Sequence, residues 1–227
     1  MKLKYKGKTK DVYELEDGNY LLQLKDDATV GEDGTLDPGG NTVGQQIEGL
    51  AKASLKMTKY YFEKMNAAGI NTHYITCDLE QANMTVKPAT QFGGKAGIEV
   101  ICRLKAVGSF LRRYGDYCQE GQDLDYYVEV SLKDDLRGDP MISKDALSML
   151  NIVTKDEYED LVRLTKQATK IIRDDLKEKG LDLYDIKMEF GRIDGQIALI
   201  DEFSWGVMRV YKDNTWLQPF ELSEYFS

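Results

Sequence analysis

The segment YDIKMEFGRIDGQIALIDEF, residues 184–203, carries charged side chains in a pattern able to bind a metal ion and a phosphate. Asp185, Lys187 and Glu189 alternate with apolar residues, so a β-strand here would pack one face on a core and present the charges on the other. Carboxylates together with substrate phosphates are the ligands that Mg²⁺ prefers, and a lysine beside them would stabilise a phosphate on the same ion. An ordinary solvated strand face is the alternative.

A second acidic pair follows at the end of the same segment, and its place depends on the intervening loop. A two-residue loop at residues 194–195 would put Asp201 opposite Met188, on the core side. A three-residue loop over residues 193–195 would put it opposite Lys187, so that carboxylates of the two strands converge. We favour the three-residue loop.

The segment EVICRLKAVGSFLRRYG has the parts of a phosphate site. Arg103 leaves a predicted strand, Gly108 permits a tight turn, and Ser109 is placed to cap a helix. Backbone N–H groups at a helix start, a hydroxyl and guanidinium groups together bind phosphate. Arg112 and Arg113 either add to such a site or solvate the helix. Gly-Ser before a helix is also a common cap without a ligand.

The segment LKDDLRGDPM is a charged loop with a turn signal at Asp139 and Pro140. A solvated loop is one interpretation. In a functional loop, Lys133 would bind a substrate carboxylate and an aspartate would receive an incoming amine.

The first ten residues, MKLKYKGKTK, place a lysine at every second position. In an extended chain Lys2, Lys4, Lys6, Lys8 and Lys10 would all point to the same side. Two interpretations follow: an edge strand protected by lysine against pairing with another chain, or a cationic stripe that binds an anion.

The composition limits the classes of protein to which the chain can belong. With 227 residues, of which 42% are hydrophobic, it can form one large domain or two small ones that share a cleft. A net charge of −9 argues against general binding to nucleic acid or to acidic membranes. No apolar run matches a signal peptide or a membrane span, which predicts a cytoplasmic protein.

Cysteine and histidine are too sparse for several common sites. Cys77, Cys102 and Cys118 are widely spaced, which indicates reduced thiols rather than disulfides or a zinc site. The only histidine is His73, so a histidine-rich metal site is excluded and any Ser-His or Cys-His pair would have to use this residue.

The elements that position these residues follow from periodicity and turn signals. Alternation predicts strands at residues 11–15, 20–24, 72–77, 84–87, 98–104, 125–132, 181–190, 196–203 and 207–211. Helical spacing predicts a helix from about residue 45 to 68, a short one after Ser109, and a long one that opens with a capping box of Thr154 and Glu157 and closes at Gly180. The Pro- and Gly-containing segment 88–97 is the predicted domain boundary.

These segments, taken in order, resemble the phosphoribosylaminoimidazole-succinocarboxamide (SAICAR) synthases of purine biosynthesis. YKGKTKDVY, KDDAT, AAGINTHYI, EVICRLKAVGS, KDDLRGDPMI, DIKMEFG and DEFS with Arg209 match that family's motifs in register over most of the chain. The resemblance implies an α+β, two-lobed, ATP-grasp-like fold with a mostly antiparallel sheet in each lobe and an ATP cleft between them. Residues 1–90 would form the ATP-binding lobe and residues 91–227 the lobe with the metal and ribonucleotide site.

The resemblance also implies an ATP- and Mg²⁺-dependent ligase. In the family, ATP phosphorylates the carboxylate of carboxyaminoimidazole ribonucleotide, and the amine of L-aspartate displaces phosphate to form an amide. Such chemistry needs charge clamps more than a nucleophilic side chain, which agrees with the absence of histidine motifs. A homodimer is expected by the resemblance, and no nucleic-acid or membrane partner is expected.

The resemblance assigns roles residue by residue. Gly7, Lys8, Lys10 and Lys87 would bind the nucleotide, and Glu189 and Asp201 would bind Mg²⁺. Arg103, Ser109 and Arg209 would hold the ribonucleotide, with Asp185 and Lys187 beside it as catalytic residues. Lys133 would bind a substrate carboxylate, and Asp139, the third catalytic candidate, would lie nearer the aspartate.

The sequence also departs from the family pattern. Trp205 and Gly206 stand where the family has Pro-Asp, residues 39–46 lack the family's lysine and paired asparagines, and Leu104 replaces an asparagine. The chain also stops before the family's customary C-terminal helix. Three further hypotheses therefore stay open: a small-molecule kinase, a related ligase acting on another carboxylate and amine, and a paralogue that binds nucleotide without turnover.

Overall fold

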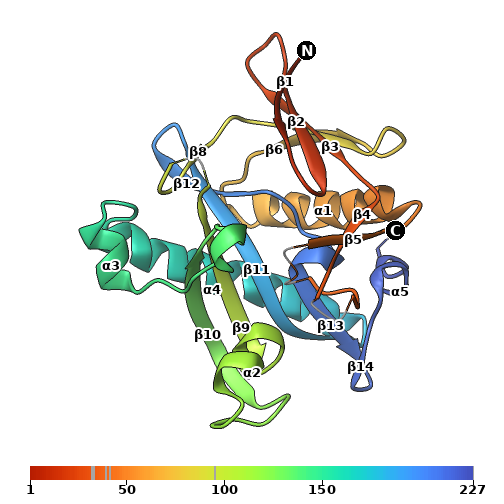
Figure 1. The fold of residues 1–227 in the computed structure, drawn as a ribbon. Coiled ribbons are helices and arrows are strands. Elements are labelled where there is room, and N and C mark those ends of the chain that lie inside the picture. Colours follow the sequence, from red (N-terminus) through yellow and green to blue (C-terminus); the bar gives the residue numbers. More distant parts are fainter. Residues whose placement is uncertain (32–33, 39, 41, 95, 227) are drawn as a thin grey trace.

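The computed structural model describes residues 1–31, 34–38, 40, 42–94 and 96–226 of the chain. Two antiparallel sheets form the body of the protein, and helices pack against them (Figure 1). The predicted α+β class and the mostly antiparallel sheets are confirmed.

The amino-terminal sheet has the strand order β1-β2-β3-β7-β6. Its strands are β1 (Lys2–Lys6), β2 (Lys10–Glu14), β3 (Tyr20–Leu24), β6 (Tyr74–Asp78) and β7 (Asn83–Val86). β1 is an edge strand with every residue exposed, which confirms the edge-strand interpretation for the lysines that it carries.

The first ten residues do not form one extended segment. β1 ends and the chain reverses, with the Gly7 N–H donating to the Lys10 carbonyl oxygen at 3.0 Å. The prediction that all five lysines share one side is therefore wrong. Lys8 lies in the turn and Lys10 begins β2, so these two lysines are separated from the edge strand and face the rest of the protein.

A small two-stranded sheet of β4 (Asp27–Val30) and β5 (Thr42–Gln46) precedes helix α1 (Leu50–Ala67). The helix predicted from residue 45 therefore begins at Leu50 instead. Pairing with β4 holds β5 extended, and Gly49, at φ 85°, separates β5 from the helix. Residues 39 and 41 of the altered glycine segment lie outside the described residues.

The carboxyl-terminal sheet has the order β10-β9-β11-β13-β14, and β8 and β12 also pair with β11. Its strands are β8 (Thr90–Gln91), β9 (Ile98–Lys105), β10 (Asp123–Leu132), β11 (Asp182–Ile193), β12 (Gln196–Ile200), β13 (Met208–Lys212) and β14 (Thr215–Trp216). The chain enters this sheet within the predicted boundary segment 88–97. The division into lobes of residues 1–90 and 91–227 stays a prediction.

Helix α4 (Lys155–Glu178) covers one face of the carboxyl-terminal sheet (Figure 1). The predicted capping box is confirmed, because Thr154 Oγ1 accepts from the Glu157 N–H at 3.2 Å and the Glu157 carboxylate accepts from the Thr154 N–H at 2.9 Å. Leu161, Ala168, Ile172 and Leu176, on the face of α4 toward the sheet, are fully buried.

The remaining helical segments are short. They are α2 (Gly108–Tyr114), η1 (Asp135–Arg137), α3 (Lys144–Met149), η2 (Trp205–Val207) and α5 (Pro219–Ser223). α5 packs on α1, and beyond it Phe226 is buried with its ring edge-to-face against Tyr60 and Tyr61. Among the described residues, no helix is long and apolar enough to cross a membrane.

The hairpin of β11 and β12 differs from the prediction that we favoured. Ile193 pairs with Gln196, so the loop has two residues, Asp194 and Gly195, both with positive φ. The three-residue loop is wrong, because the two strands close through a tight turn that these two residue types permit. The last pair of the hairpin is Glu189 with Ile200, and Asp201 lies beyond it.

Candidate active site

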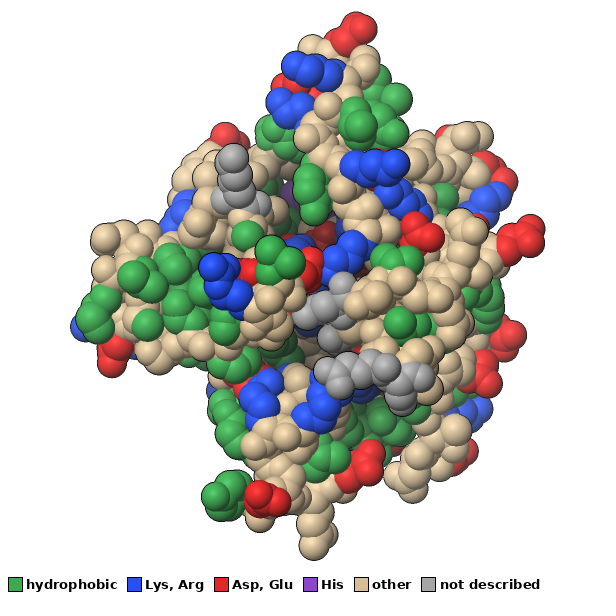
Figure 2. All heavy atoms as spheres, viewed as in Figure 1, with side chains coloured by type: hydrophobic (Ala, Val, Ile, Leu, Met, Phe, Trp, Pro, Cys, Tyr) green, Lys and Arg blue, Asp and Glu red, His purple; other side chains and the backbone are tan. Residues whose placement is uncertain are grey.

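A cavity lies between the two sheets, and most of the predicted nucleotide and metal residues line it. Those residues are Gly7, Lys8, Lys10, Glu189 and Asp201, and they are joined by Lys187, a predicted catalytic residue, and by Lys133, a predicted substrate-binding residue. Glu99 and Glu202 line it as well. Figure 2 shows a hollow near the centre of this face, where acidic and basic side chains lie together.

Strand β11 positions the charged residues as the alternation predicted. Ile186 and Met188 are buried in the core, while Lys187 and Glu189 face the cavity. Glu189 lies directly opposite Glu99 on β9, and like charges at such a position are destabilising unless a cation lies near. The Lys187 ammonium supplies one, donating to Glu99 at 2.7 Å.

Lysine 133 completes this part of the cavity. Its ammonium donates to the Glu189 carboxylate at 2.5 Å, from the segment that follows β10. Ser131 donates to the other oxygen of Glu99 at 3.2 Å. Acidic and basic groups from β9, from β11 and from the segment after β10 therefore alternate along one wall.

Asp201 reaches the cavity by leaving the strand. Its φ is 72°, a conformation in which an aspartate is tolerated better than most residues, and this turns its carboxylate away from the core position opposite Met188. The Lys10 ammonium hydrogen-bonds to Asp201 and, at 2.8 Å, to Glu202. Although burial lowers it, these two carboxylates raise the pKa of Lys10 above its ordinary value.

Glu189 and Asp201 have the environment of cation ligands. Burial, and then the negative charge of Asp201, raise the pKa of Glu189. Burial alone would raise the pKa of Asp201 as well, but Lys10 and Lys133 hold it well below its usual range. Two carboxylates that repel each other in one cavity fit a divalent cation that takes its other ligands from phosphates. Among the described residues, no group of three or more His, Cys, Asp or Glu side chains is placed to hold a metal ion. A cation at Glu189 and Asp201 would therefore need further ligands, such as phosphate oxygens.

The segment around η1 reaches the turn between β1 and β2. Lys8 forms an ion pair with Asp135 at 2.7 Å, and both line the cavity. The Asp139 carboxylate accepts from the Asp134 N–H at 2.7 Å and closes the loop. Lys87 is exposed and does not line the cavity. Asp139 and Lys87 are therefore the two predicted site residues of this region that do not line the cavity.

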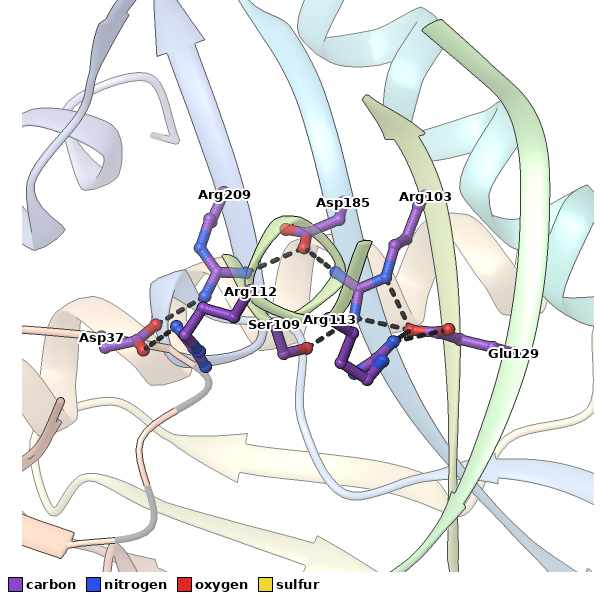
Figure 3. A network of polar contacts seen from close by, with 8 residues as sticks. All are labelled: Asp37, Arg103, Ser109, Arg112, Arg113, Glu129, Asp185 and Arg209. Atoms are coloured by element: carbon purple, nitrogen blue, oxygen red, sulfur yellow. Dashed lines mark hydrogen bonds and ion pairs between the residues drawn. The ribbon is translucent and has the colours of Figure 1, made fainter. Parts of the chain in front are cut away.

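The predicted ribonucleotide residues form a second cluster on the carboxyl-terminal sheet (Figure 3). The register places Asp185 directly opposite Arg103 on β9 and Arg209 on β13. One oxygen of Asp185 accepts from both guanidinium groups, at 2.7 and 2.8 Å. Arg103, only 2% exposed, also donates to Glu129 at 2.7 Å and to Ser109 at 2.8 Å.

Arg209 lies at the end of this cluster opposite Glu129 (Figure 3). Its guanidinium lies against Gly108, where an added Cβ would come within 2.7 Å of it. The Arg209 Nη2 donates to Asp37, which comes from the segment between β4 and β5. Although burial lowers it, the carboxylates of Asp185 and Asp37 raise the pKa of Arg209.

Several residues that build these two clusters were missed by the sequence reasoning. Glu99 and Arg103 lie four residues apart in one predicted strand, so their side chains point to the same face of the sheet. This spacing was the signal that could have identified Glu99. Asp37 lies in the least regular segment of the chain, and Glu129 and Asp135 lie among other acidic residues, so the sequence marks none of them.

Trp205 and Gly206, which depart from the family pattern, both line the cavity. The Trp205 indole is buried, stacks on Trp216 and donates to the Leu217 carbonyl oxygen at 2.8 Å. Gly206 lines the cavity without a side chain. His73 is buried against Phe62, and burial lowers its pKa to about 4, so it is neutral near pH 7.

Known proteins resemble this chain over nearly its full length. A family model described as SAICAR synthetase matches residues 3–222. The phosphoribosylaminoimidazole-succinocarboxamide synthase of Clostridium tetani is 56% identical over 226 residues, which cover 99% of this chain and 98% of that protein. The enzyme of the same name from Finegoldia magna is 36% identical, over 93% of this chain and 86% of that protein.

Solved structures agree with the sequence comparisons. A SAICAR synthetase in complex with ADP superposes with a TM-score of 0.81 at 27% identity, covering 93% of this chain and 84% of that one. The overall fold is therefore shared with that structure.

Proposed function

The chain belongs to the SAICAR synthetase family, and on that premise we propose that it joins L-aspartate to the carboxylate of carboxyaminoimidazole ribonucleotide at the expense of ATP. It is a ligase of purine biosynthesis. The observation that carries the proposal is the cavity in which Lys8 and Lys10, from one sheet, face Glu189 and Asp201, from the other.

In the first step, a carboxylate oxygen of the ribonucleotide attacks the γ-phosphorus of ATP, and the bond to the β,γ-bridging oxygen breaks. The products are an acyl phosphate and ADP. Lys8 and Lys10 would bind the phosphate oxygens, with Gly7 allowing close approach of the backbone. Positioning and charge neutralisation supply most of the catalysis in phosphoryl transfer.

Glu189 and Asp201 would hold Mg²⁺ together with phosphate oxygens. When bound, the ion neutralises charge that develops on the transferred phosphoryl group. Lys187, held by Glu99 on the same wall, would stabilise the reacting carboxylate.

In the second step, the neutral amine of aspartate attacks the acyl carbon, phosphate leaves with the electron pair of the broken C–O bond, and the nitrogen loses a proton to the departing phosphate. Lys133 would release Glu189, its partner in the structure, and bind a carboxylate of the aspartate instead. Asp139 supports this step only through the loop that it closes.

Arg209 and Ser109 would bind the ribonucleotide, with Asp185 positioning Arg209 and Arg103 positioning Ser109. Arg103 directs its N–H groups to protein partners, which supports a role in holding Ser109 and Asp185. In this proposal residues 1–90 supply ATP binding, and residues 91–227 supply the metal and ribonucleotide groups. Lys87 stays a predicted nucleotide contact.

The test is ADP release with Mg-ATP, carboxyaminoimidazole ribonucleotide and L-aspartate, leaving out each component in turn. Release that needs all three, with an amide product, is the expected result. Release without the amine would identify a kinase, and release only with another carboxylate or amine would identify a related ligase. Nucleotide binding without any release would overturn the enzymatic proposal. Sedimentation velocity tests the homodimer that the family resemblance implies.

A further inference from the structure

The Asp37 carboxylate lies between two guanidinium groups at the edge of the ribonucleotide cluster (Figure 3). Its Oδ1 accepts from Arg209 Nη2 at 2.5 Å, and its Oδ2 lies 3.7 Å from Arg112 Nη1. Both Asp37 and Arg209 are largely shielded from solvent, at 16% and 11% side-chain exposure. A single anion therefore bridges two arginines on the side of the cluster that faces away from Arg103.

The backbone fixes Asp37 independently of its carboxylate. The Asp37 N–H donates to the Thr29 carbonyl oxygen at 3.1 Å, and Thr29 Oγ1 donates to the Asp37 carbonyl oxygen at 2.8 Å. The side chain can therefore change partner by rotation while its backbone stays on β4.

The cluster has an excess of positive charge that Asp37 partly offsets. The eight residues in Figure 3 include four guanidinium groups, those of Arg103, Arg112, Arg113 and Arg209, and three carboxylates. Glu129 and Asp185 neutralise the inner arginines. The N–H groups that Asp37 occupies are the ones that would otherwise meet an incoming anion.

We propose that Asp37 is a specificity-determining residue that competes with the ribonucleotide phosphate for Arg209 and Arg112. The inference rests on the proposed function, in which Arg209 binds that phosphate. A phosphate monoester carries a charge of about −1.5 to −2 at neutral pH and has three acceptor oxygens, so it outcompetes a carboxylate for two guanidinium groups. Singly charged anions gain no such advantage, and Asp37 therefore selects for the phosphorylated substrate.

The direction of the Asp37→Asn effect tests this inference. Removing a competitor raises the fraction of protein competent to bind, so the Kd for ribose 5-phosphate, measured by calorimetry, should fall by about tenfold. If Asp37 instead positions Arg209 for the ligand, the same Kd should rise, and the inference is overturned. An unchanged Kd also overturns it.

Two controls separate competition from other effects. Asp160→Asn makes the same change in net charge on the exposed face of α4, and it should leave the Kd unchanged. Asp37→Ser removes the carboxylate without an amide that can hydrogen-bond to arginine, and it should lower the Kd like Asp37→Asn. In addition, acetate, a singly charged anion that does not displace Asp37 from the two guanidinium groups, should show measurable binding only in Asp37→Asn.

Failure of the Asp37 inference and failure of the proposed function would give different experimental results. Binding of ribose 5-phosphate is measured without ATP or aspartate, so a kinase or another ligase with this cluster would still give the predicted fall in Kd. Absence of binding to both the unchanged protein and Asp37→Asn would show that the cluster is not a phosphate site, and it would overturn the inference. The omission assay for ADP release decides the proposed function separately.

Discussion

The ammonium of Lys10 bonds to the carboxylate of Asp201, although 191 residues of sequence separate them. One lies at the start of β2 in the amino-terminal sheet and the other lies just beyond β12 in the carboxyl-terminal sheet. This contact, with the neighbouring bond to Glu202, joins the two sheets at the cavity, so the same lysine serves both the fold and the proposed ATP site.

Replacement of Lys10 by Gln should raise the KM for ATP by roughly 10- to 100-fold, because a hydrogen bond to a charged group is worth about 1.5–3 kcal/mol. The midpoint of thermal unfolding should also fall, since Asp201 and Glu202 lose their shared cation. Lys4→Gln is the matched control, because Lys4 pairs with Glu14 on the exposed edge. Equal KM values for the two variants would contradict the assignment of Lys10.

Replacement of Glu189 by Gln or of Asp201 by Asn should raise the Mg²⁺ concentration for half-maximal turnover, because each removes a charged ligand. We expect at least about a 10-fold increase. Calorimetric titration of the protein with Mg²⁺ and ADP gives a readout independent of turnover. Glu159→Gln, at an exposed position on α4, is the control. If both variants keep Mg²⁺-dependent turnover intact, the metal assignment is wrong.

Replacement of Gly108 by Ala should raise the KM for the ribonucleotide, because the new Cβ would lie 2.7 Å from the Arg209 guanidinium and displace it. It should also lower the free energy of unfolding by about 1–2 kcal/mol, the cost of a left-handed conformation for a residue with a Cβ. Gly121 has φ 75° and open space around it, so Gly121→Ala should show the stability cost alone. A KM change in both variants would argue against displacement of Arg209.

His73 should make the protein less stable as the pH falls. Its pKa is about 4 in the folded state, because of burial, against 6.5 for an ordinary histidine. The unfolded chain therefore binds a proton first, and stability that is complete above pH 6.5 is lost between pH 6.5 and 4. We expect a loss of about 2 kcal/mol from about pH 7.5 to about pH 5.

Urea unfolding of the unchanged protein and of His73→Gln measures this contribution. The difference in unfolding free energy between the two should shrink as the pH falls, because only the unchanged protein loses stability through this residue. Parallel pH dependences of the two proteins would show that His73 does not titrate as its burial predicts.

Local signals were sufficient to predict the regular parts of the fold. β3 and the capping box of α4 appear where alternation and end signals placed them, since these features depend on near neighbours in sequence. The start of α1 was not predictable in this way. Residues 45 and 46 are compatible with a helix, and pairing of β5 with β4, which the sequence does not signal, keeps them extended.

In the candidate site, too, local periodicity predicted some residue positions, and contacts between segments determined the others. The alternation of β11 correctly brought Lys187 and Glu189 to one face. Asp201 reaches the cavity by a different route from the one that we favoured, because a single left-handed residue compensates for the two-residue loop. Strand periodicity cannot predict such a turn. Asp37 likewise depends on a contact between an irregular segment and a distant strand, for which the sequence holds no pattern.

Because Lys10 and Asp201 are far apart in the sequence, the ribosome makes them at different times. A ribosome adds about 5–20 residues per second, so Lys10 is made roughly 10 to 40 s before its partner. During that interval the amino-terminal sheet can form, but its cavity lysines have no carboxylates from the other sheet to neutralise them. Lys10 is therefore without its two carboxylate partners until Asp201 and Glu202 have been made, and the proposed nucleotide site is complete only then.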